Sequence, residues 1–164
     1  MNFDSKEELY FSWWLDELIE AEWVLSYERS TPILLFAKMV KHYEKKLKTK
    51  TKILQKTILP EHIYTPDFDV VFIPEFAEKC EFFHNEGGCV VEIKGDYDRN
   101  NMTRLFKINQ KWSAKELGIM VNLVKIPSFF KKTFTPKRYL LTDQTMRERK
   151  LNYKPRTLQQ FMEG

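Results

Sequence analysis

The chain has 164 residues, of which 43% are hydrophobic and 15% aromatic, with only five glycines. This composition favours a folded globule with a normal hydrophobic core over a disordered chain. No apolar run reaches the ~18–20 residues that span a membrane, and "MNFDSKEEL" has neither the basic start nor the apolar stretch of a secretory signal. We therefore expect a cytoplasmic protein with no membrane partner, in which the two cysteines stay reduced.

Charge is distributed unevenly along the chain, although the formal net charge is only +4. Acids dominate residues 4–22, with seven acids and one base, and residues 61–92, with eight acids and one lysine. Bases dominate residues 38–56, with eight lysines and one acid, and residues 125–156, with ten bases and two acids. A polyanion would bind the basic segments, and a cation would suit the acids between them. Solvated surface faces are the simpler explanation of any single run.

The first predicted helix covers residues 5–23, "SKEELYFSWWLDELIEAEW". Its expected apolar face consists of Leu9, Trp13, Leu15, Leu18 and Ile19. Ser5 followed by Glu8 is the capping-box pattern, with serine at the N-cap and glutamate at the third helical position. A short strand is expected at 24–27. The segment 33–59 is ambiguous, because β-branched and aromatic residues favour strand toward its end whereas 33–46 also suits a helix.

Two further strands are predicted over residues 68–73 and 89–94, and an irregular excursion over residues 74–88 separates them. The first strand begins just after a proline and an aspartate. The second is apolar except for one glutamate and one lysine, and it ends on a glycine. These two strands carry the residues that suggest a function.

The rest of the chain contains a predicted helix over residues 99–118, which a glycine ends, and a strand over 119–126, which a proline ends. Residues 127–164 form a basic, aromatic tail without a clear period, in which Thr157 is expected to cap a short final helix. This tail suits either a nucleic-acid contact or a dimer-forming arm. The order of elements predicts a single α/β domain over residues 1–164, with its core at about 5–126.

Asp67, Glu92 and Lys94 have the residue types that metal-dependent phosphodiester cleavage requires. Mg²⁺ takes one or two protein carboxylates together with water and substrate phosphate, so Asp67 and Glu92 could share one ion if their strands are neighbours. Glu92 and Lys94 are two residues apart on a strand, and their side chains therefore project from the same face. The lysine could then orient the attacking water or neutralise charge that grows on the phosphate.

Simpler explanations exist for each of these residues. Asp67 follows a proline and could be only a turn residue, and Glu92 with Lys94 could be a surface pair. Charges inside an apolar strand are nevertheless functional candidates, which favours the site. The capping box explains Glu8 completely, although capping and metal binding do not exclude each other.

Cys80, His84 and Cys89 suggest a second kind of site, for zinc. The C-x3-H-x4-C spacing has no obvious fourth ligand, although His62 could serve. A buried cysteine pair and a surface histidine are the simpler interpretation.

The tryptophans of the first 23 residues are expected to pack in the core, and only exposed ones could stack on single-stranded nucleic acid.

"TPD" followed by "VVEIKG" resembles the PD-(D/E)xK nuclease superfamily, with Asp67, Glu92 and Lys94 at its three signature positions. "SKEELYFSWWLDEL" is similar to the first helix of phage endonuclease I-like and Holliday-junction-resolvase-like members, which implies a fourth acidic residue, Glu8 or, as the fallback, Glu7. "MTRLFKINQKWSAKELGI" resembles the helix that follows the signature strand. Twenty-four residues separate Asp67 from Glu92, more than is usual for the family, which requires an extra loop or hairpin.

The resemblance implies a restriction-endonuclease-like core, a mixed central β-sheet flanked by helices, and a Mg²⁺-dependent endonuclease for which Mn²⁺ can substitute. Asp67 and Glu92 would bind the metal and Glu8 would assist. The implied substrate is branched DNA such as a Holliday junction, cut by a homodimer that is phage-encoded and works in a bacterial host's cytoplasm. Alternatives are an inactive DNA-binding or assembly protein with the same fold, and a nuclease for other DNA structures.

Basic residues are expected to hold the phosphate backbone without reading bases. The two basic segments, 38–56 and 125–156, are the general candidates, and the helix after the signature strand adds two more residues that could face the substrate. The individual candidates are Lys107, Lys111, Lys131, Lys132, Lys137 and Arg138.

Overall fold

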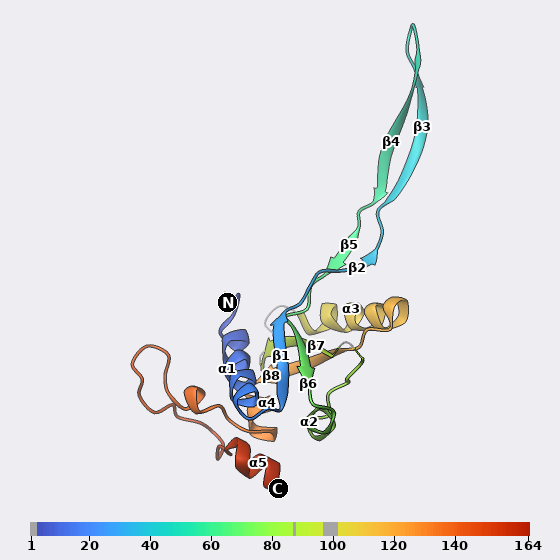
Figure 1. Cartoon of the computed structure of the whole chain (residues 1–164). Coiled ribbons are helices and arrows are strands. Elements are labelled where there is room, and N and C mark those ends of the chain that lie inside the picture. The colour runs from blue at the N-terminus through green and yellow to red at the C-terminus, as the bar shows by residue number, and fades with distance from the viewer. Residues whose placement is uncertain (1–2, 87, 97–101) are drawn as a thin grey trace.

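The computed structural model describes residues 3–86, 88–96 and 102–164 and has a mixed α/β fold (Figure 1). Its elements are, in chain order, α1 (Lys6–Glu20), β1 (Val24–Arg29), β2 (Ile33–Phe36), β3 (Met39–Lys46), β4 (Thr51–Leu59), β5 (His62–Tyr64), β6 (Phe68–Phe72), α2 (Pro74–Lys79), β7 (Cys89–Gly95), α3 (Met102–Leu117), β8 (Val121–Ile126), α4 (Ser128–Lys132), the 3₁₀ helix η1 (Lys137–Leu140) and α5 (Leu158–Glu163). None of the described helices is long and apolar enough to cross a membrane.

A four-stranded mixed sheet forms the centre of the fold, in the order β1-β6-β7-β8. β6 runs antiparallel to both β1 and β7, whereas β7 and β8 are parallel and are joined through α3. The expected mixed sheet with helices is therefore confirmed. The excursion between β6 and β7 is not wholly irregular, because α2 occupies its first part and a bridge between Asn85 and Gly88 closes it.

Two hydrophobic clusters lie on opposite faces of this sheet. Cys89, Val91 and Ile93 of β7 belong to the larger cluster, whereas Val90 packs against the smaller one. Because successive side chains of a strand point to opposite faces, the two clusters cover both sides of β7. At the centre of the larger cluster, the Trp14 ring stacks between Phe11 and Phe134, with both centroid distances 5.3 Å.

The buried face of α1 differs from the expected one. The fully or nearly buried apolar residues of the helix are Tyr10, Phe11, Trp14, Leu15 and Leu18. Leu15 and Leu18 match the prediction, but Ile19 is 41% exposed and Trp13 is only partly buried. The helix is apolar over most of its circumference, so the spacing of apolar residues alone does not fix its rotation.

The segment between β1 and β6 consists of strands, so the helical alternative for residues 33–46 is wrong. β2 pairs antiparallel with β5, and β3 pairs antiparallel with β4. β3 and β4 form a two-stranded ribbon that projects far from the body of the molecule (Figure 1). Backbone pairing with the returning strand, rather than burial, accounts for the extended conformation of β3.

The C-terminal segment is packed on the body and contributes to its core. Phe130, Phe134, Tyr139 and Phe161 are buried in the larger hydrophobic cluster. Thr157 caps α5 as expected, through a reciprocal capping box with Gln160. The hydrophobic core thus includes residues beyond Ile126.

We expect Phe134→Ala to lower the free energy of unfolding by about 3–5 kcal/mol, because it removes a fully buried ring that stacks on Trp14. Phe83→Ala is the matched control, since the Phe83 side chain is 59% exposed, and should change stability by less than about 0.5 kcal/mol. Urea unfolding followed by tryptophan fluorescence measures both. Equal stability of the two variants would contradict a core that includes the C-terminal segment.

Candidate active site

The carboxylate of Asp67 lies against the middle of β7. Asp67 directly precedes β6, and its N–H donates to the carbonyl of Val91 at 3.0 Å. Its Oδ2 in turn accepts the N–H of Ile93 at 2.6 Å. Since Ile93 stands between Glu92 and Lys94, this hydrogen bond brings the three signature positions together. The strands that carry them are neighbours, as the site required.

The return of the chain to β7 depends on Gly88. Its φ of +104° lies in the left-handed region, and a Cβ at this position would come within 2.5 Å of the carbonyl oxygen of Val70. Only glycine allows this close approach without moving the backbone of β6. Gly88 therefore lets the excursion between β6 and β7 rejoin the sheet in register.

The carboxylate of Glu92 is buried and held at both oxygens. The residue is 6% exposed, its Oε1 lies 2.5 Å from Nζ of Lys94, and its Oε2 accepts the hydroxyl of Tyr64 at 3.0 Å. The ion pair confirms that Glu92 and Lys94 project from the same face of β7. Burial and the negative charge of Glu92 raise the pKa of Tyr64, so this tyrosine stays a hydrogen-bond donor at neutral pH.

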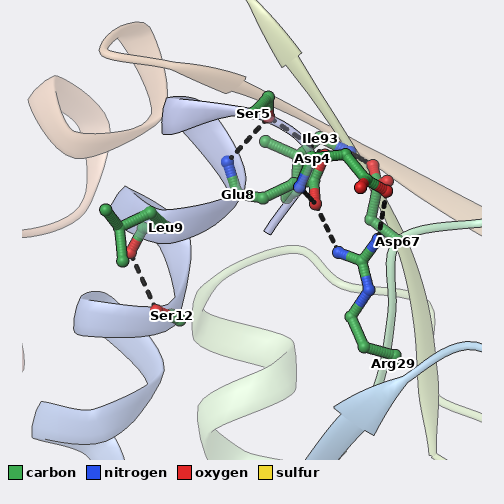
Figure 2. A network of polar contacts seen from close by, with 8 residues as sticks. All are labelled: Asp4, Ser5, Glu8, Leu9, Ser12, Arg29, Asp67 and Ile93. Atoms are coloured by element: carbon green, nitrogen blue, oxygen red, sulfur yellow. Dashed lines mark hydrogen bonds and ion pairs between the residues drawn. The ribbon is translucent and has the colours of Figure 1, made fainter. Parts of the chain in front are cut away.

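Glu8 lies in the first turn of α1 and is 5% exposed. Ser5 caps this turn by accepting the N–H of Glu8 at 3.2 Å, which confirms the predicted N-cap. The Glu8 side chain does not complete the capping box, because it forms an ion pair with Arg29 and accepts the N–H of Asp4 at 3.1 Å. Figure 2 shows Arg29 reaching from β1 toward both Glu8 and Asp4, with Asp67 close by.

Glu7, the fallback for the helix carboxylate, lies beside the end of β7. A Cβ added to Gly95 would be 3.3 Å from Oε1 of Glu7. The glycine that follows the signature lysine thus leaves room for this side chain. Both α1 carboxylates are therefore close to the strand that carries Glu92, and Glu8 is the one whose charge Arg29 compensates.

The environment of Asp67 opposes its negative charge. Burial and the nearby carboxylates of Glu92 and Glu8 together raise the pKa of Asp67 to about 7, against the lowering effects of the Ile93 amide and Lys94. Among the described residues, the second carboxylate oxygen, Oδ1, accepts no hydrogen bond. A cation beside Asp67 would remove the electrostatic penalty, because opposite charge favours the ionised carboxylate.

This donor set fits Mg²⁺. Asp67 and Glu92 supply two carboxylates, and Mg²⁺ in proteins is commonly bound through one or two carboxylates with water and phosphate completing its shell. Within residues 3–86, 88–96 and 102–164, no group of three or more His, Cys, Asp or Glu side chains is arranged to hold a metal ion. In this arrangement the Glu8 carboxylate is paired with Arg29.

The zinc alternative is not supported in the part of the chain that the structure describes. Burial raises the pKa of both Cys80 and Cys89 to about 12, so both side chains are neutral thiols at neutral pH in the metal-free protein. The Nε2 atom of His84 lies 3.2 Å from the carbonyl oxygen of Phe72. His62 stacks on Trp112 and shares a hydrogen bond with the side chain of Asn109.

The residues expected to bind DNA are mostly on the surface. Lys107, Lys111, Lys131, Lys132 and Lys137 are exposed. Arg138 differs, because its guanidinium packs over the ring of Trp13 at 4.6 Å from the centroid. This packing favours a structural role for Arg138 over a contact with phosphate.

Tyr64 and Arg29 are site residues that the sequence patterns did not identify. Tyr64 contacts Glu92 across 28 positions of the chain, and Arg29 contacts Glu8 across 21. Neither contact has a local periodicity that would signal it. The only hint is position, since Tyr64 precedes the "TPD" stretch directly.

Comparison of the chain with protein-family models, with curated proteins and with solved structures finds no match. The geometry around Asp67, Glu92 and Lys94 is therefore the basis for assigning a function.

We expect Tyr64→Phe to lower the free energy of unfolding by about 1.5–3 kcal/mol, because it removes a hydrogen bond to a buried carboxylate. Tyr43→Phe, on the exposed ribbon, is the matched control and should leave stability unchanged. Thermal unfolding of both variants beside the wild type is the measurement. A Tyr64→Phe protein as stable as the wild type would show that the hydroxyl does not support Glu92.

The raised pKa of Asp67 predicts how stability depends on pH. The folded state holds the Asp67 proton up to about pH 7, whereas the unfolded chain releases it near 3.8, so the free energy of unfolding falls as pH rises between these values. Asp67→Asn removes this dependence. Between pH 4 and pH 8, its free energy of unfolding should therefore rise by about 4 kcal/mol relative to that of the wild type, at about 1.4 kcal/mol per pH unit. Urea unfolding at pH 4, 6 and 8 without metal tests this. Parallel profiles for the two proteins would contradict it.

Proposed function

We propose that the protein is a Mg²⁺-dependent DNA endonuclease of the PD-(D/E)xK type. The observation that carries the proposal is the hydrogen bond from the Ile93 amide to Asp67, which places this carboxylate beside Glu92 and Lys94. Three charged side chains that are separated in the sequence thereby share one partly buried location. Such a grouping is costly for a folded protein, and it is explained by a cation and a phosphate that bind there.

The topology supports a restriction-endonuclease-like core. α1 is followed by the three sheet strands β1, β6 and β7, then by α3 and the parallel strand β8. The paired strands β2 to β5 are an insertion between β1 and β6. Asp67 enters at the start of β6 and Glu92 at the centre of β7, the two halves of the signature on adjacent antiparallel strands.

Each residue of the site has a role in this proposal. A bound Mg²⁺ would lower the pKa of a water molecule and withdraw charge from the phosphate. Asp67 and Glu92 would hold the ion, and the ammonium group of Lys94 would position the attacking water or neutralise the phosphate. Tyr64 orients Glu92 through its hydrogen bond to Oε2. Arg29 compensates Glu8 and so limits the negative charge around Asp67.

Branched DNA such as a four-way junction is the proposed substrate. Symmetric resolution of a junction requires two cuts, so the active form would be a homodimer. The exposed lysines of α3 and α4 are available for phosphate contacts, among them Lys107, Lys111, Lys131 and Lys132. Such contacts would position the duplex without reading its sequence.

The test is cleavage of junction, flap, duplex and single-stranded DNA in the presence of Mg²⁺. Asp67→Asn and Glu92→Gln should each lower the rate at least about 100-fold, because loss of a metal ligand removes several kcal/mol of transition-state stabilisation. Both variants should keep their affinity for DNA, measured with Ca²⁺ in place of Mg²⁺.

Asp69→Asn is the matched control, since Asp69 lies on β6 and accepts a hydrogen bond from Ser30 at 2.7 Å. It should cleave like the wild type. Undiminished cleavage by Asp67→Asn would refute the assignment of the site. A wild-type protein that binds junctions and cuts none of the substrates would instead identify a binding protein with this fold.

A further inference from the structure

The ribbon formed by β3 and β4 contributes no residue to either hydrophobic cluster. All of its side chains are exposed except Val40 and Leu54, which are half-buried. A two-stranded ribbon alone in water is marginally stable at best, so this extension adds little to the stability of the fold. Its sequence is therefore best explained by what it contacts outside the chain.

The register of the ribbon sorts its lysines onto one face. Lys41 lies opposite Lys56, and Lys45 lies opposite Lys52. Between these two pairs, Tyr43 lies opposite Leu54 on the same face. We call this surface the lysine face, and it consists of Lys41, Tyr43, Lys45, Lys52, Leu54 and Lys56.

The other face of the ribbon is different in charge. Its cross-strand pairs are Val40 with Thr57, His42 with Gln55, Glu44 with Ile53, and Lys46 with Thr51. It thus carries one lysine and one glutamate, whereas the lysine face carries four lysines and no acid. The positive charge of the ribbon is thus concentrated on the lysine face.

The lysine face carries an electrostatic cost in the free protein. Like charges directly opposite each other destabilise a pair of strands, and the ribbon has two such pairs side by side. Among the described residues, none of these four lysines forms an ion pair. A row of phosphates would convert this repulsion into attraction and release counterions as it binds.

The spacing of the lysine pairs suits duplex DNA. The pairs are four residues apart on each strand, which is about 13 Å at the rise of a β-strand. The major groove is about 12 Å wide, so a ribbon that crosses the groove meets a row of phosphates on each side at about this separation. One lysine pair can therefore reach each side of the groove, with Tyr43 and Leu54 over the space between them.

The ribbon is also connected directly to the candidate active site. β5 continues the returning arm of the extension and ends at Tyr64, whose hydroxyl donates to Glu92. Asp67 follows three residues later. The ribbon that would hold the DNA is thus linked through β5 to Tyr64, which supports the carboxylate of Glu92.

We propose that the lysine face of the β3–β4 ribbon binds the phosphate backbone of duplex DNA, with the ribbon lying across the major groove. The proposal rests on the proposed function for the choice of DNA as the polyanion, but it does not require cleavage. It assigns recognition to residues away from the carboxylate site and makes the ribbon a second, separate contact with the substrate.

The test is binding of a fluorescein-labelled DNA duplex, followed by anisotropy in Ca²⁺ from about 50 to about 200 mM salt. Replacing Lys41, Lys45, Lys52 and Lys56 by glutamine should lower the slope of log affinity against log salt by about 3–4, at about 0.9 per lost phosphate contact. The single variants provide a matched pair. Lys45→Gln should lower the slope by about 1, whereas Lys46→Gln, its neighbour on the other face, should leave it unchanged.

An unchanged slope in the fourfold variant overturns the proposal, as does a wild-type protein that does not bind the duplex. Light scattering tests the alternative in which the ribbon binds a second copy of the chain. A fourfold variant that loses a dimer while keeping its slope would make the ribbon an interface between copies. Asp67→Asn separates the two proposals, because it should lose cleavage and keep the full salt dependence. If the wild type cuts no DNA but its salt dependence of binding is lowered by the fourfold substitution, only the proposed nuclease activity is refuted.

Discussion

The hydrogen bond between the Ile93 amide and Asp67 is the constraint on which the rest of the site depends. It forms only if β6 lies beside β7 in the observed register, with Phe68 opposite Val91. It also places one carboxylate close to another that is almost fully buried. Because buried charges are expensive unless they are paired, the neighbouring groups can be understood as compensation, with Lys94 against Glu92 and Arg29 against Glu8.

Much of the site could be predicted from the sequence because its parts are local. The period of a strand places Glu92 and Lys94 on one face, and the serine before the helix predicts its cap. The supporting contacts could not be predicted, because Tyr64 and Arg29 reach the site only through strand pairings that no local pattern encodes. Hydrophobic patterns report burial. They therefore left β3 of the exposed ribbon ambiguous, although β-branched residues correctly favoured strand for β4, and they fixed the rotation of α1 only in part, because this helix is apolar on too many sides.

Recognition and chemistry would be divided between two parts of the molecule that share a covalent link. The ribbon offers charge and reach, and the sheet offers a preorganised pair of carboxylates. A duplex held at the ribbon would raise the effective concentration of phosphate at the sheet without any new contact there. The electrostatic repulsion between Asp67 and Glu92 would then be relieved when the cation and the substrate bind together.

The insertion between β1 and β6 also has a consequence for folding. Arg29 pairs with Phe68, so joining these central strands requires the closure of a loop of 38 residues. Contacts between β3 and β4 are local and can zip from the turn toward the body, and the pairing of Ile33 with Tyr64 then brings the two ends together. Only a few residues remain to be closed once the ribbon has formed, and the entropy of loop closure falls accordingly. The projecting ribbon can thus act as a guide for assembly of the sheet from which it extends.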